Sequence, residues 1–139
     1  MGKKMHKLLL LALALVPMSS LAINKPTTLF MYGFAASFND STVYFTGIQK
    51  VDTAWTDSKT GFLYSRENYS YQLRDYMKKH GSAYPTCITV YAKKRKDIEK
   101  KYETLKKRYA SKGQYTVKFI PDNEFLFRPI IPDESERKE

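Results

Sequence analysis

The fold is decided between Thr86 and Ile120, where the sequence reads TCITVYAKKRKDIEKKYETLKKRYASKGQYTVKFI. Residues 86–92 are rich in β-branched and aromatic side chains and predict a strand. A strongly basic segment follows, and residues 115–120 predict another strand. A strand, a helix and a strand within about 35 residues have the spacing of a parallel crossover unit, which is right-handed in nearly all known proteins.

The basic segment predicts an amphipathic helix. At about 100° per residue, four apolar side chains fall within roughly 60° of one another on a helical wheel: Ile98, Tyr102, Leu105 and Tyr109. We expect this seam to face a sheet and most of the lysines to form the solvated outer face of the helix. Asp97 is the expected N-cap, which leaves the preceding four residues in a loop.

That loop is the candidate ligand-binding site, and it consists of Lys93, Lys94, Arg95 and Lys96. Cations at a helix N-terminus oppose the helix dipole, at about 0.3 to 1 kcal/mol for each nearby charge. In open α/β sheets ligands bind beside the carboxyl ends of parallel strands, where such a loop lies. The hypothesis is that the loop contacts an anionic lipid, a glycan or an acidic protein. The alternative is a solvated loop, because a run of charge is weak evidence by itself.

The net charge is concentrated in the same segment. The chain has 139 residues, with 24 Lys and Arg against 14 Asp and Glu. Residues 1–22 contain three of the lysines and none of the acids, so the remainder carries a net charge of +7. Residues 93–112 hold ten bases and three acids, also a net +7, so the rest of the mature chain sums to zero.

Residues 1–22 have the layout of a cleaved signal peptide, with lysines, the apolar run Leu8 to Val16 and small residues ending at Ala22. We therefore expect export to the periplasm or the extracellular space, where nucleic acid is a poor candidate for the anionic partner. No later apolar run approaches the roughly 20 residues of a membrane-spanning helix. Residues 23–132 are expected to form one domain, followed by a frayed, charged tail at 133–139.

The remaining elements complete the predicted fold. Strands are expected at 28–38 and 42–47, joined by a turn at 39–41, and a helix is expected from Ser65 to His80. The polar segment 50–62 is expected to be irregular, with a strand extension as the alternative, and Phe125 and Phe127 are expected to add a short edge strand. The prediction is an α+β domain, a two-layer, mixed β-sheet with two helices in the order β-β-α-β-α-β.

Other candidate sites are less specific. Trp55 lies between Asp52 and Asp57, which suits a sugar-binding platform, although a lone tryptophan is more often part of a core. Cys87 and His80 are the only cysteine and histidine after residue 22, and a small hydrolase or transferase would need them or the acids near Trp55. No metal-ligand spacing or phosphate-binding glycine loop occurs, so no metal or cofactor is expected.

The sequence thus predicts an exported binding or accessory module and no catalytic residues. The chain contains 11 tyrosines and 8 phenylalanines, and two helices leave open whether both faces of a sheet are covered. An uncovered tyrosine-rich face would suit a protein partner or self-association.

Overall fold

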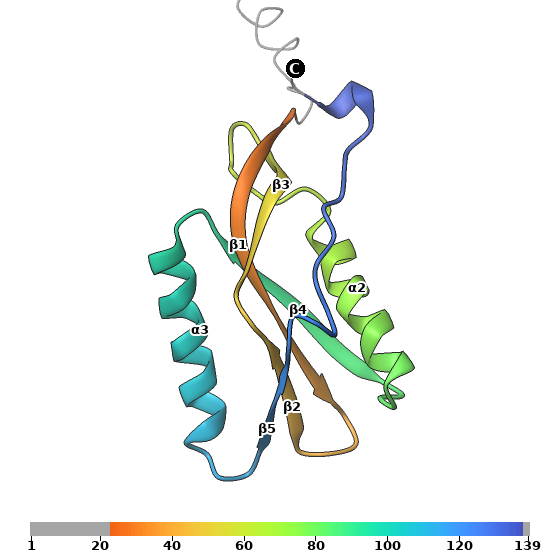
Figure 1. Cartoon of the computed structure of the whole chain (residues 1–139), viewed down its shortest axis with the longest axis vertical. Coiled ribbons are helices and arrows are strands. Elements are labelled where there is room, and N and C mark those ends of the chain that lie inside the picture. Colours follow the sequence, from red (N-terminus) through yellow and green to blue (C-terminus); the bar gives the residue numbers. More distant parts are fainter. Residues whose placement is uncertain (1–22, 138–139) are drawn as a thin grey trace, which may run out of the picture.

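The computed structural model describes residues 23–137, and the predicted signal peptide lies outside the described residues. Five strands, two α-helices and one short 3₁₀ helix occur in this part of the chain (Figure 1). The mixed α+β architecture is as predicted. The elements are β1 (Asn24–Ser37), β2 (Thr42–Thr46), β3 (Gln49–Asp57), α2 (Arg66–Lys79), β4 (Pro85–Ala92), α3 (Arg95–Ala110), β5 (Thr116–Ile120) and η2 (Glu134–Glu136).

Strand β1 lies at the centre of the sheet. Its two halves pair antiparallel with β3 and then β2 along one edge, and β4 pairs antiparallel along the other edge. Strand β5 pairs with β2 in parallel. Strands β4 and β5 therefore run in the same direction, with β1 and β2 between them. This confirms the predicted crossover, in which α3 connects two strands of the same orientation.

Strand β3 corrects the main prediction for residues 50–62, which were expected to be irregular with a strand extension as the alternative; only residues 58–62 are irregular. Val51 lies opposite Leu29 and Ala54 lies opposite Thr27, so β3 carries one extra residue at a bulge. Val51 and Ala54 are both buried but stand three residues apart instead of two, because the extra residue lies between them. This spacing interrupts the period-2 pattern that identifies a strand. The observed order is β-β-β-α-β-α-β.

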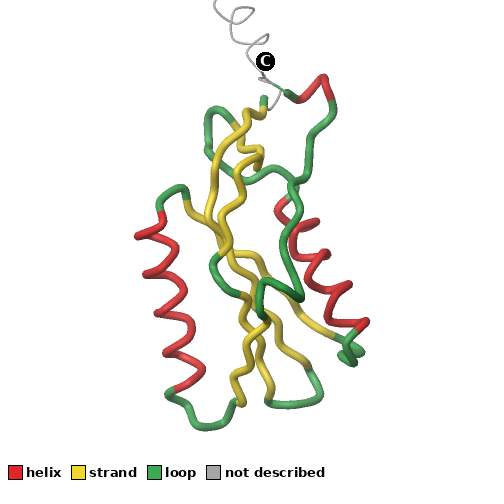
Figure 2. Tube along the Cα trace, viewed as in Figure 1, coloured by secondary structure: helices red, strands yellow, loops and turns green. Residues whose placement is uncertain are grey.

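Both faces of the sheet are covered by a helix (Figure 2). Leu29, Met31 and Ala35 of β1 belong to one buried cluster, which includes side chains of α2. Tyr32 and Phe34 alternate with them and belong to a second cluster, which includes side chains of α3. Helix-on-sheet packing thus occurs once on each face, and the predicted seam of α3 does face the sheet. Most of the aromatic side chains of the sheet are consequently core residues in residues 23–137, although Ile88 and Phe119 remain exposed on β4 and β5.

The segment after β5 completes the cover on the α2 face. Phe125 and Phe127 are buried, but the expected edge strand does not form. The side chain of Gln49 replaces strand pairing, because its Nε2 donates to the Phe125 carbonyl at 3.1 Å and its Oε1 accepts the Phe127 amide at 2.8 Å. Near the end of the described chain, Asn24 Nδ2 donates to the carbonyl of Glu136 at 3.2 Å. The fraying predicted for residues 133–139 stays a prediction.

Candidate binding groove beside helix α3

The predicted basic loop is shorter than expected. Helix α3 begins at Arg95, and the N-cap is Lys94 in an extended conformation, so the prediction of Asp97 as the cap was wrong. The Lys94 carbonyl accepts the amides of Asp97 at 3.1 Å and Ile98 at 3.2 Å. Asp97 instead lies in the first turn, where its negative charge interacts favourably with the helix dipole.

Two of the four basic residues have neighbours in different parts of the molecule. All four are exposed, and Lys93 lies beside Gly61 in the turn after β3. Arg95 donates from Nε to Glu99 at 3.0 Å, and its guanidinium lies 5.8 Å from the centre of the Phe30 ring. Arg95 therefore has a local ion pair within α3.

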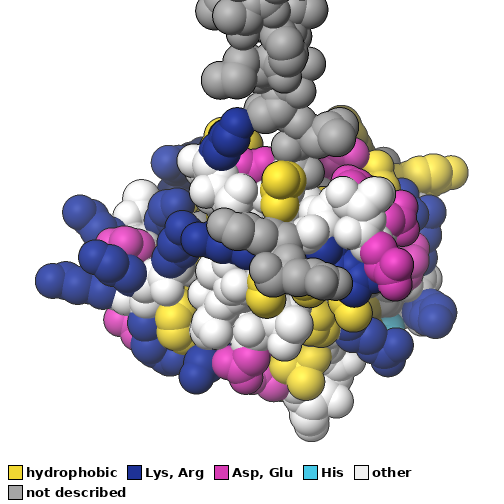
Figure 3. Space-filling view, turned by 90° about the horizontal axis from the view of Figure 1, so that it is seen from above, with side chains coloured by type: hydrophobic (Ala, Val, Ile, Leu, Met, Phe, Trp, Pro, Cys, Tyr) yellow, Lys and Arg dark blue, Asp and Glu magenta, His cyan; other side chains and the backbone are white. Residues whose placement is uncertain are grey.

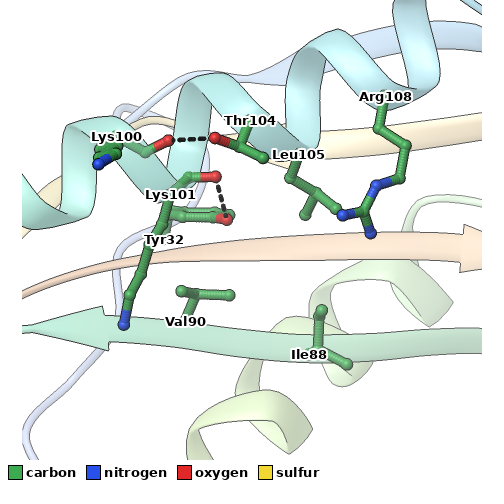
Figure 4. Close-up of a pocket in the computed structure, with 8 residues that line it drawn as sticks. All are labelled: Tyr32, Ile88, Val90, Lys100, Lys101, Thr104, Leu105 and Arg108. Carbon is green, nitrogen blue, oxygen red and sulfur yellow. Dashed lines mark hydrogen bonds between the residues drawn. The ribbon is translucent and has the colours of Figure 1, made fainter.

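A groove with a different set of cations lies between α3 and β4, one turn further along the helix (Figure 4). Its volume is about 390 Å³. Figure 4 shows side chains of α3 on one side and side chains of β4 on the other, with Tyr32 of β1 between them. The lining residues are Tyr32, Ile88, Val90, Lys100, Lys101, Thr104, Leu105 and Arg108.

The floor of the groove is apolar. Ile88 and Val90 are two residues apart on β4 and therefore share one face of the strand. The Tyr32 ring is buried and packs edge-to-face against Tyr102 with ring centres 4.9 Å apart. Burial raises the pKa of Tyr32 to about 12, and its hydroxyl donates to the Lys101 carbonyl at 3.5 Å. Tyr32 therefore remains neutral and contributes an aromatic surface to the groove. Ile88 is 42% exposed, so the floor is open to solvent.

The rim of the groove is cationic. Lys100, Lys101 and Arg108 are exposed, and the groove lining contains no carboxylate. Within residues 23–137 none of these three makes an ion pair, because the described ion pairs are Lys50 with Asp52, Arg74 with Asp75, and Arg95 with Glu99. Seen from above, dark-blue side chains project on the left of the molecule, which is the α3 side (Figure 3). The groove thus combines an apolar floor with cations that make no ion pair among residues 23–137.

Sequence reasoning assigned these lysines to a solvated helix face and missed the groove. A signal was present, because Lys101 and Arg108 are seven residues apart and lie on the same side of α3. Ile88 and Val90 similarly share a face of the preceding strand. The sequence does not state which side of the helix lies next to that strand, and this information is needed to join the two patterns.

The two acids beside Trp55 each have a local partner, and the sugar-binding platform stays a prediction. Trp55 is half-buried on β3, opposite Pro26. The Asp57 carboxylate accepts the backbone amides of Lys59 and Thr60, both at 2.8 Å, and these hydrogen bonds lower the pKa of Asp57. Asp52 forms a 3.6 Å ion pair with Lys50. Both carboxylates are therefore used locally.

Cys87 and His80 likewise have separate environments. Burial raises the pKa of the half-buried Cys87 thiol to about 11, the opposite of the shift that activates a nucleophile. His80 pairs through Nδ1 with the Tyr76 carbonyl at 2.8 Å and stacks on the Tyr76 ring with centres 4.1 Å apart. Cys87 lines a cavity between α2 and β4 to which His80 does not contribute. Among the described residues, no three His, Cys, Asp or Glu side chains are placed to share a metal ion.

Comparison of the chain with protein-family models, curated proteins and solved structures gives no match. In residues 23–137, neither α2 nor α3 has the length and apolar character that crossing a membrane requires, and no further helix there has them.

Proposed function

We propose that the chain is an exported binding module that holds an anionic ligand in the groove between α3 and β4. The observation that carries this proposal is the combination of an apolar floor with Lys100, Lys101 and Arg108 on the rim and no carboxylate in the lining. Binding sites are typically apolar clefts with a few convergent polar groups that fix orientation. Export rests on the signal-peptide layout of residues 1–22.

An anion gains more in this groove than at an isolated surface lysine. Cations that flank an apolar surface act where part of the surrounding water is excluded, so their attraction to an anion is less screened. The guanidinium of Arg108 also offers a planar pair of donors to an oxyanion. The predicted loop at residues 93–96 lies at the start of the same helix and adds to the positive field that attracts the ligand.

The test uses the mature chain, Ile23 to Glu139, and anilinonaphthalene sulfonate, a fluorescent probe with an apolar ring system and one anionic group. One variant replaces Lys100, Lys101 and Arg108 with alanine. A matched variant replaces Lys96, Lys106 and Lys107 with alanine. It removes the same charge from α3, but outside the groove. A third variant replaces residues 93–96, the loop predicted from the sequence.

We expect the groove variant to bind the probe about tenfold more weakly, which corresponds to about 1.4 kcal/mol. The matched variant should change binding by less, and binding by the parent protein should weaken as salt is raised. Circular dichroism of each variant establishes that the fold is retained. Equal probe binding by the groove variant and the matched variant would contradict the proposal. A loss confined to the third variant would move the site to the loop.

A further inference from the structure

The groove is elongated along α3, because a cation lies near each end of its apolar strip. Lys101 and Arg108 are seven residues apart, which is about 10 Å along a helix axis at 1.5 Å per residue. Leu105 lies between them on the helix, and Ile88 and Val90 face it from β4 (Figure 4). The apolar surface is therefore an elongated strip and not a round pocket.

The two end cations differ in what they already contact. Lys101 Nζ donates to the Tyr91 carbonyl at 3.5 Å, a contact that holds the lysine against the edge of β4. No hydrogen bond or ion pair to another described residue is made by the Arg108 side chain. Figure 4 shows its guanidinium pointing from α3 toward β4, beside Leu105 and Ile88. Of the two end cations, Arg108 is thus the one without an intramolecular partner among residues 23–137.

We infer that the ligand is a single-chain amphiphile with an oxyanion head, its head at Arg108 and its chain along Ile88, Val90 and Leu105. This inference rests on the proposed function, and it names the chemical class of the ligand. A carboxylate or a phosphate monoester accepts the two parallel N–H donors of a guanidinium. One alkyl chain suits a groove of about 390 Å³, near the lower end of the sizes common for ligand pockets.

A free amphiphile fits better than a bilayer surface. Side chains that enter a bilayer project beyond the surrounding charges, whereas in this groove only Ile88 is exposed, Val90 and Leu105 are half-buried and Tyr32 is buried. The apolar strip runs along an open groove between α3 and β4, and Ile88 is its exposed part. A single chain can lie along the whole strip, whereas a bilayer surface would contact chiefly Ile88 and the surrounding cations.

The experiment measures binding of the mature protein by calorimetry to dodecanoate, dodecyl phosphate, butyrate and the neutral dodecyl maltoside, each below its micelle concentration. Vesicles of anionic phospholipid form a fifth arm. We expect dodecanoate or dodecyl phosphate to bind at least a hundredfold more tightly than butyrate, because each buried methylene contributes about 0.8 kcal/mol. The stronger of the two long-chain ligands identifies the preferred oxyanion.

Two variants locate the ligand within the groove. Thr104→Trp places a large ring in the groove and should abolish dodecanoate binding, whereas Ala110→Trp adds the same ring elsewhere on α3 and should leave binding unchanged. Arg108→Gln should weaken dodecanoate about tenfold and Arg108→Lys less, because lysine keeps the charge but lacks the planar fork. Unchanged dodecanoate binding by Thr104→Trp would overturn the inference.

The ligand arms separate failure of the inference from failure of the proposed function. Equal binding of butyrate and dodecanoate, both sensitive to the groove cations, would overturn the single-chain ligand and leave anion binding standing. Equal binding of dodecyl maltoside and dodecanoate would overturn the proposed function, because charge would then play no part. Binding to vesicles with none to the free amphiphiles would overturn the inference in favour of a membrane surface.

Discussion

The side-chain oxygen of Gln49 accepts a hydrogen bond from the backbone amide of Phe127, 78 residues later in the chain, at 2.8 Å. The same side chain donates to the carbonyl of Phe125. One buried glutamine thus takes the place of a neighbouring strand for the segment that follows β5. This arrangement holds two buried phenylalanines over the α2 face of the sheet.

Gln49→Leu should therefore destabilise the protein. The substitution leaves a buried amide and a buried carbonyl without partners, at about 1 to 3 kcal/mol for each unsatisfied group. Gln72 provides a matched control, because its side chain binds both the amide and the carbonyl of Arg128 in an exposed position. Water can replace those bonds, so Gln72→Leu should cost less. Urea unfolding of both variants measures the difference, and equal losses would contradict a structural role for the buried pair.

Gly33 lies where side chains of α2 and of the segment after β5 pack closely on β1. A Cβ at this position would approach Leu73 Cδ2 to 2.6 Å and Phe127 Cζ to 3.1 Å. Gly33→Ala should cost about 1 to 3 kcal/mol through overpacking. Gly47→Ala is the control, because the nearest atoms there are side-chain atoms of Asp122 at 3.3 Å and Phe119 at 3.5 Å, and both residues are exposed. A Gly33→Ala protein as stable as the Gly47→Ala protein would contradict this expectation and show that the Leu73 and Phe127 side chains can make room for a methyl group.

The Cys87 thiol should react slowly in the folded protein. Its pKa is about 11, compared with an ordinary value of 9.0, so at pH 8 the thiolate is about a hundredfold less populated than in an unfolded chain. The rate of alkylation by iodoacetamide should rise about tenfold per pH unit until the pH approaches that pKa. The same protein in guanidinium chloride is the control.

The raised pKa of Cys87 also predicts how the stability of the folded protein changes with pH. The folded chain keeps the thiol proton to higher pH than the unfolded chain, so the stabilisation is complete below about pH 9 and is lost as the pH rises toward 11. Cys87→Ala should remove this part of the pH dependence. Fast alkylation at pH 8 in the folded state would contradict the assignment and reopen a catalytic role for Cys87.

Arg66 should protect the free edge of β4. Its Nε donates to the Thr89 carbonyl at 3.0 Å, which shows that this carbonyl points away from β1. Unpaired strand edges promote pairing with another chain, and charged side chains over the edge prevent it. Arg66→Ala should increase self-association, measured by light scattering over a range of protein concentration. Arg95→Ala is the control, because Arg95 forms its ion pair within α3, and equal association of the two variants would rule out edge protection.

The strand, helix and strand between Thr86 and Ile120 could be predicted because each has a clear period. Ile98, Tyr102 and Leu105 repeat at helical spacing, and the structure places them against the sheet. The period-2 pattern is interrupted in β3, where a bulge adds one residue between the buried positions. The same pattern wrongly predicted a strand at Phe125 and Phe127, whose backbone groups bond to the side chain of Gln49 and not to a strand.

The groove could not be predicted for a different reason. Its lining comes from three elements, and their juxtaposition depends on the pairing of β4 with the far edge of β1. Helical periodicity places Lys101 and Arg108 on one side of α3, but it does not say what that side contacts. The charge run at residues 93–96 was the strongest local signal in the sequence, while the cavity formed one turn later, where the lysines are more widely spaced.

The bridge between Asn24 and Arg137 brings the two ends of the described chain side by side (Figure 1). A short linker could join these residues without disturbing the sheet, and the chain could then be reopened in the turn between Phe38 and Ser41. Such a circular permutant would make the central strand β1 the last element synthesised instead of the first. Its contacts would be unchanged, so the order in which the strands emerge can be varied independently of the structure that they form.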